Sequence, residues 1–180
     1  MLVNTATAYD AKAIANGVLK IADAAGSTLS PMKLQKLVYY AHGWNLAINK
    51  RPLINERIEA WKFGPVVPSL YHAFKEYGSA PIKTPALEFK YADAGSPWYF
   101  EPSIDDPCGL SPEETEFTKR LLKRIWEQYG KYTGEQLSEA THRHGTPWHQ
   151  VRSKHGNVKN VDIPDELIRS YFESIATGQK

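Results

Sequence analysis

The chain has 180 residues, of which 42% are hydrophobic, a composition typical of a globular domain and not of a disordered chain. Its 22 Lys and Arg nearly balance its 20 Asp and Glu, so the net charge gives no overall attraction to nucleic acid or to a membrane surface. A single cysteine, Cys108, excludes an internal disulfide and a multi-cysteine zinc site, and we expect it to be a free thiol in a loop.

Two helices are predicted at the start of the chain. Apolar residues recur at three- and four-residue steps over 11–22, and Gly26 is a suitable stop for the first helix. Ser30 as the cap and Pro31 as the first helical residue open a second helix that reaches about residue 49. We expect the inward face of this second helix to carry Leu34, Leu37, Val38, Ala41 and Ile48.

The pattern then changes from helical to strand-like. Short runs of β-branched and aromatic residues at 53–54 and 58–63 predict two brief strands. Gly64 and Pro65 are expected to end the second strand and to shape the turn into a third helix, which stops at Gly78. We expect the buried face of this third helix to carry Leu70, Tyr71, Phe74 and Tyr77.

The second half combines a Pro-rich connection with further helices. The connection covers 79–110, and within it 87–91 alternates well enough for an edge strand. Helix starts follow at Ser111, Thr133, Thr146 and Pro164, the first two with capping boxes. The sequence therefore predicts a mainly α, single compact domain over 1–180, with its core at about 10–175, about six helices and a small antiparallel β-hairpin or sheet.

Catalytic motifs are mostly missing from the chain. Ser30 and Lys33 match the S-x-x-K pattern of serine nucleophiles, but Ser30 already has a role as a helix cap and the companion motifs are absent. Zinc-type ligands do cluster further along, at His142, His144, His149 and His155. No Cys, Asp or Glu lies between residues 141 and 161 to complete such a site, so a histidine-based metal-dependent hydrolase is an alternative and not the main interpretation.

The segment 142–160 is also basic. It has no carboxylate, and its cations are Arg143, Arg152, Lys154 and Lys159. Such a patch fits nucleic acid with Trp148 as a stacking residue, an ordinary solvated surface, or an acidic partner. Four dispersed cations are few for a phosphate track, so nucleic acid is not the expected partner.

Two long motifs resemble the Panacea domain family, whose members are described as phage-associated or SocA-like. The first motif is SPMKLQKLVYYAH at 30–42, and the second is IEAWKFGPVVPSLY at 58–71. Shorter similarities lie at 137–142, 147–148 and 168–172, so that the resemblance covers roughly residues 10–175. The motif residues that we single out are Leu34, Lys36, Leu37, Tyr39, His42, Gly64, Pro65, Val66, His142 and Pro147.

The resemblance implies an antitoxin that neutralises its cognate toxin, encoded by an adjacent gene, through direct protein binding. It also implies an alternative, a proteolytic adaptor that delivers the toxin to an AAA+ protease. Neither role involves catalysis, a cofactor or a membrane. The chain starts without a secretory signal and has no apolar run of membrane-spanning length, so we expect a cytoplasmic protein.

A neutralising surface needs a few large anchors, because a few residues carry most of the binding energy of a protein interface. Tryptophan suits this role, since it offers a large contact area for little ordering entropy. From residue type and motif position, the expected partner-binding residues are Trp44, Trp61, Lys62, Phe63 and Trp148.

Overall fold

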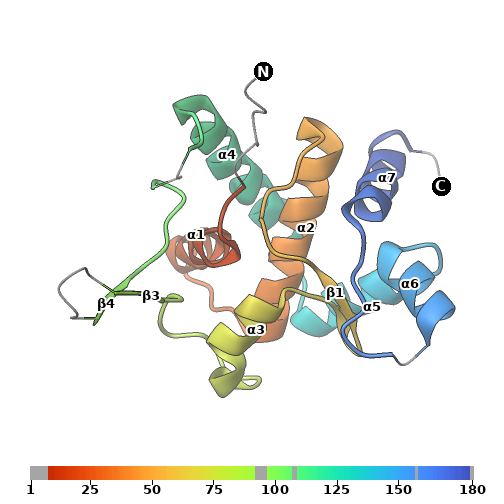
Figure 1. Cartoon of the computed structure of the whole chain (residues 1–180), viewed down its shortest axis with the longest axis horizontal. Helices are drawn as coiled ribbons and strands as arrows, with labels where there is room; N and C mark the ends of the chain where they lie inside the picture. The colour runs from red at the N-terminus through yellow and green to blue at the C-terminus, as the bar shows by residue number, and fades with distance from the viewer. Residues whose placement is uncertain (1–7, 92–96, 107–108, 157, 179–180) are drawn as a thin grey trace.

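The computed structural model describes residues 8–91, 97–106, 109–156 and 158–178, so Cys108 lies outside the described residues. The described part is mainly helical, which confirms the predicted fold class (Figure 1). Its helices are α1 (Ala11–Ala24), α2 (Pro31–Asn49), α3 (Pro68–Phe74), the 3-10 helix η1 (Lys75–Tyr77), α4 (Pro112–Tyr129), α5 (Gly134–His142), α6 (Pro147–His155) and α7 (Asp165–Ala176). Its strands are β1 (Glu59–Trp61), β2 (Gly64–Val66), β3 (Glu88–Tyr91) and β4 (Pro97–Phe100), paired as two separate antiparallel hairpins.

Helix α2 is the central element. It packs against α1, α3, α4, α5 and α7, and Figure 1 shows α1 and α4 on one side of it and α5, α6 and α7 on the other. Ser30 caps it and Pro31 is its first residue, as predicted. Its predicted inward residues are buried except Ile48, which is 54% exposed because it lines an open hollow between α2, α4 and α7.

The predicted strand-to-helix turn at Gly64 and Pro65 is wrong. Both residues belong to β2, which pairs with β1 so that Trp61 lies opposite Gly64, and the turn between the strands is Lys62-Phe63. Gly64 has a φ of +103°, which lets the chain reverse immediately after that turn. The chain then enters α3 after Val67, so a complete β-hairpin stands where a single strand and a strand-to-helix turn are predicted.

Two smaller expectations in this region also fail. Residues 53–54 do not form a strand; their β pairing is limited to one isolated parallel bridge, between Ile54 and Tyr9. Helix α3 is short and buries Leu70 and Phe74, whereas Tyr71 is 42% exposed. The exposed Tyr71 packs instead against the ring of Trp61, at a centroid distance of 4.9 Å.

The Pro-rich connection is fastened by one buried polar side chain. The predicted edge strand exists as β3, but its partner β4 was not predicted. Asn16 of α1 is 1% exposed, and its amide donates to the carbonyl oxygens of Ala86 (3.0 Å) and Pro102 (2.9 Å) and accepts from the Ala86 N–H (2.8 Å). These bonds hold the connection on both sides of the β3–β4 hairpin against α1.

The later helices begin where the sequence predicts. Ser111 and Thr133 form complete capping boxes with Glu114 and Gln136, and Thr146 caps α6. Pro164 is the cap residue of α7. None of the helices in the described ranges is long and apolar enough to cross a membrane.

Candidate partner-binding site

The turn of the β1–β2 hairpin is the most exposed part of the family-like motifs. Phe63 is 56% exposed, and the Lys62 ammonium lies 5.2 Å from the centroid of its ring. The turn is nevertheless fixed, because the hydroxyl of Ser138 in α5 donates to the Phe63 carbonyl oxygen at 2.8 Å. A large apolar side chain is thus presented to solvent from a backbone that is already ordered.

Lys36 of α2 lies buried directly beneath this hairpin. Its side chain is 1% exposed, and its ammonium donates to the carbonyl oxygen of Pro65 at 3.1 Å. No carboxylate of the described residues forms an ion pair with it, and burial lowers the pKa of Lys36 to about 7. The motif lysine is therefore a structural support of the hairpin and not a surface contact.

Gly64 closes the space above Lys36. A Cβ at this position would lie 2.7 Å from the Thr141 hydroxyl oxygen and 2.8 Å from Lys36 Cε. We expect Gly64→Ala to lower the free energy of unfolding by about 2 kcal/mol, from its positive φ and from crowding together, measured by urea denaturation. The control is Gly26→Ala, which shares a positive φ but has nothing within 4 Å, and should cost about 1 kcal/mol. Equal losses in the two variants would contradict the crowding.

A second polar residue of α2 secures the exit of the hairpin. The Gln35 amide donates to the Val67 carbonyl oxygen at 3.1 Å and accepts from the Val67 N–H at 2.9 Å. The middle of β2, at Pro65, and its exit, at Val67, are therefore both bonded to α2. Sequence analysis missed Gln35, and its only signal was a polar residue within a helix that is buried almost all round.

His142 and Trp148 pack together beside the hairpin. Their rings stack at 3.9 Å, and the Trp148 indole N–H donates to the Trp61 carbonyl oxygen at 2.7 Å. Burial and the nearby Lys36 lower the pKa of His142, so its ring is neutral at neutral pH. The structure therefore unites Trp61 and Trp148 with the Lys62-Phe63 turn, and we call these four residues the hairpin face.

Trp44 does not belong to the hairpin face. Its indole N–H donates to the Tyr129 hydroxyl at 2.9 Å, and its ring packs on Phe172 at 5.4 Å, in the contact of α2 with α4 and α7.

His42 has a similar structural role, because its Nδ1 accepts the Ile54 N–H (3.5 Å) and its Nε2 donates to Asp165 (3.0 Å) at the start of α7. The remaining motif residues are buried in the core or beneath the hairpin: Leu34, Leu37, Tyr39, Val66 and Pro147.

The catalytic alternatives find no geometric support. The Ser30 hydroxyl caps α2, and the Lys33 ammonium donates to the Gly130 carbonyl oxygen at 2.6 Å. His144 and His149 are ring neighbours at 4.9 Å, while His142 stacks on Trp148. Among the described residues no group of three or more His, Cys, Asp or Glu could hold a metal ion.

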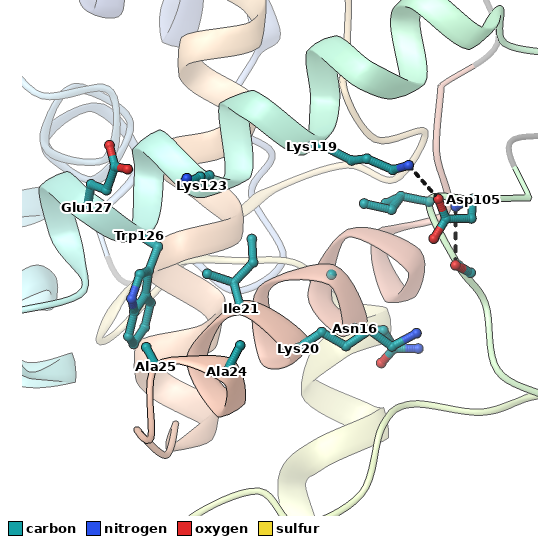
Figure 2. A pocket seen from close by; sticks show the side chains of 13 residues that line it. Asn16, Lys20, Ile21, Ala24, Ala25, Asp105, Lys119, Lys123, Trp126 and Glu127 are labelled. Carbon is teal, nitrogen blue, oxygen red and sulfur yellow. Dashed lines mark hydrogen bonds and ion pairs between the residues drawn. The ribbon is translucent and has the colours of Figure 1, made fainter.

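Two further hollows differ in the charges that line them. One, of about 540 Å³ between α1 and α4, has an apolar floor that includes Ile21 and Trp126 (Figure 2). Two of its lysines are engaged, since Lys119 pairs with Asp105 (2.7 Å) and Lys20 pairs with Glu101 (2.9 Å). Lys123 and Glu127 also line it, so it carries charges of both signs. The other, which we call the basic groove, has about 660 Å³ and adjoins the hairpin face; it is lined by Ala60, Trp61, Lys62, Tyr71, Arg152 and residues 158–160.

The family of the chain is shown by two comparisons. Residues 34–149 match the family described as "Antitoxin SocA-like, Panacea domain". The chain is also similar to Antitoxin SocA of Caulobacter vibrioides (strain NA1000 / CB15N), with 32% identity over 169 residues that make up 91% of this chain and 82% of that protein. No solved structure matches. The chain therefore belongs to the SocA-like antitoxin family with a Panacea domain, which supports an antitoxin role, a toxin as the general kind of partner and a non-enzymatic activity.

Proposed function

We propose that this chain is an antitoxin that acts in the cytoplasm and neutralises a toxin, encoded by an adjacent gene, by direct contact through the hairpin face. The observation that carries the proposal is an exposed aromatic residue, Phe63, on a rigid support within the matched family region. Interfaces gain most of their energy from a few such anchors in an ordered setting.

The hairpin face is preorganised for binding. The Phe63 carbonyl oxygen accepts from Ser138, the Trp61 carbonyl oxygen accepts from Trp148, and the Pro65 carbonyl oxygen accepts from Lys36. Ordering a loop during association costs free energy, and here that cost is met when the protein folds. A surface of this kind favours stable sequestration of a partner.

Co-expression tests the proposal directly. The adjacent open reading frame is induced in a bacterial host, with and without this chain, and growth is followed. We expect growth arrest that the chain relieves, together with co-purification of the two proteins. A harmless neighbour, or toxicity that the chain does not change, would contradict the proposal.

The same host distinguishes sequestration from the adaptor role. Relief by sequestration should persist in a strain that lacks the AAA+ protease, with the toxin still abundant. An adaptor should lower the amount of toxin only where the protease is present. Relief that disappears in the protease-deficient strain would assign the adaptor role instead.

Phe63→Ala is expected to weaken toxin binding by about 2 kcal/mol, or roughly 30-fold in Kd, because the variant removes the central apolar anchor. The measurement is isothermal titration of the purified pair. Tyr132→Ala is the matched control, since Tyr132 is also exposed (38%) and also has a lysine ammonium, that of Lys131, 5.2 Å from its ring. The control should leave Kd within about twofold, and equal losses in both variants would place the interface elsewhere.

A further inference from the structure

The backbone around the basic groove is already paired. On one side of β1, the Ala60 N–H donates to the Val161 carbonyl oxygen (2.8 Å) and the Ile163 N–H donates to the Ile58 carbonyl oxygen (2.7 Å). On its other side β1 pairs with β2, whose Pro65 carbonyl oxygen accepts from Lys36. A partner cannot add a strand to such a hairpin, so recognition in this groove must use side chains.

The charges of the basic groove have one sign. Its lining includes Lys62, Arg152 and Lys159, and no carboxylate of the described residues lines it. Neither Lys62 nor Lys159 forms an ion pair with a carboxylate of the described part of the chain. The carboxylates of Glu59 and Asp162, near the groove, are paired with Arg57 of the same chain, at 3.2 Å and 3.7 Å. The groove therefore presents positive charge to whatever binds there.

The floor of the groove is aromatic and fixed in position. Trp61 packs edge-on against Tyr71, and its indole N–H donates to the buried Glu59 carboxylate at 2.7 Å. Arg152 is positioned by its hydrogen bond to the Val158 carbonyl oxygen (3.0 Å) and by the Trp148 ring, 5.9 Å away. Cations are therefore set around an apolar floor, an arrangement that suits a peptide with both acidic and large apolar side chains.

We propose that the basic groove binds an acidic, extended segment of the toxin, with carboxylates facing Lys62, Arg152 and Lys159 and a large apolar side chain against Trp61 and Tyr71. This inference rests on the proposed antitoxin function and names the chemistry of the partner. Charge complementarity selects the occupant, because three cations beside an apolar floor match a short acidic peptide better than the long phosphate track of a nucleic acid.

The test compares two charge-reversed variants of the full chain with the toxin from the adjacent gene, by isothermal titration. The groove variant, Lys62→Glu with Lys159→Glu, reverses the charge at two lysines that line the groove. The control variant, Lys123→Glu with Lys131→Glu, changes the net charge of the protein equally at exposed lysines outside the groove. Lys131 is closely matched to Lys62, since each ammonium lies 5.2 Å from the ring of the next residue. We expect the groove variant to weaken Kd at least roughly tenfold and to reduce its salt dependence, while the control stays within about threefold.

The outcomes separate this inference from the proposed function. Tight binding by the unmodified chain, with equal effects of the two variants, would overturn the groove assignment and leave the antitoxin function standing. No binding by the unmodified chain would overturn both. Overlapping peptides of the toxin supply the second readout: those that bind the unmodified chain and not the groove variant should be acidic, and neutral or basic ones would contradict the proposal. Tighter binding of a single-stranded oligonucleotide than of any toxin peptide would assign the groove to nucleic acid instead.

Discussion

Replacing Phe172 with alanine is expected to lower the free energy of unfolding by about 4 kcal/mol, the largest loss that we predict for a single side chain. Phe172 is fully buried, and it joins α7 to the central helix α2. Its aromatic neighbours lie at centroid distances of 5.4 to 6.0 Å and are Tyr39, Tyr40, Trp44 and Tyr171. The small Gly43 makes room for this ring, since a Cβ there would lie 2.2 Å from Phe172 Cε2.

The loss should be large because this site cannot easily collapse. The surrounding rings belong to two helices that are fixed by many other contacts, so removal of the phenyl ring leaves a cavity. Urea denaturation followed by circular dichroism measures the effect. Phe63→Ala removes the same atoms from an exposed position and should change stability by less than about 1 kcal/mol. Similar losses in the two variants would contradict the docking of α7 on α2.

This pair of phenylalanines also separates structure from binding. Phe172→Ala should reduce toxin neutralisation only as far as it reduces the amount of folded protein. Phe63→Ala should reduce toxin binding while the protein remains folded. The distinction matters for reading any screen of this chain, because most of the family-like motif residues, such as Leu34 and Tyr39, are buried and act on the fold.

Local features of the fold were predictable from the sequence. The capping boxes at Ser111 and Thr133 depend on bonds between residues three apart, so the motif and its structure coincide. The β1–β2 hairpin depends on what lies beneath it. The sequence predicts a turn at Gly64 and Pro65 because these residue types usually break regular structure. In the structure Gly64 provides the positive φ, and Pro65 accepts a bond from Lys36, which lies 29 residues away in the sequence.

The candidate site was predictable in part, for the same reason. Residue type and motif position predict Trp61 and Trp148 as partner-binding residues. The structure brings these two residues together, and their role in binding stays a prediction. Residue type alone could not distinguish Trp44 from the tryptophans of the hairpin face. Its indole N–H is bonded to Tyr129 in the contact of α2 with α4. The burial of Gln35 and Lys36 was also not predictable, because a helix sequence does not reveal which polar residues have distant partners.

The pH dependence of stability is expected to report on Lys36. Burial lowers its pKa from 10.5 to about 7, so between these values the unfolded chain binds a proton that the folded chain has released. Stability must then rise with pH across this window, at up to about 1.4 kcal/mol per pH unit. We expect the free energy of unfolding to be about 2 kcal/mol higher near pH 9.5 than near pH 7.5.

Lys36→Met isolates this contribution, because methionine fills similar space without an ionisable group. The contributions of other titratable groups cancel when the pH dependence of the variant is compared with that of the unmodified chain. In the folded protein the pKa of His142 is lowered, so this side chain titrates below the window, and the pKa values of Tyr39 and Tyr40 are raised, so these side chains titrate above it. The variant should show little rise in stability between the two pH values in urea denaturation. A rise as steep as that of the unmodified chain would mean that Lys36 stays charged beneath the hairpin. If Lys36 does lose its proton near neutrality, the donor to the Pro65 carbonyl oxygen changes from a charged ammonium to a neutral amine.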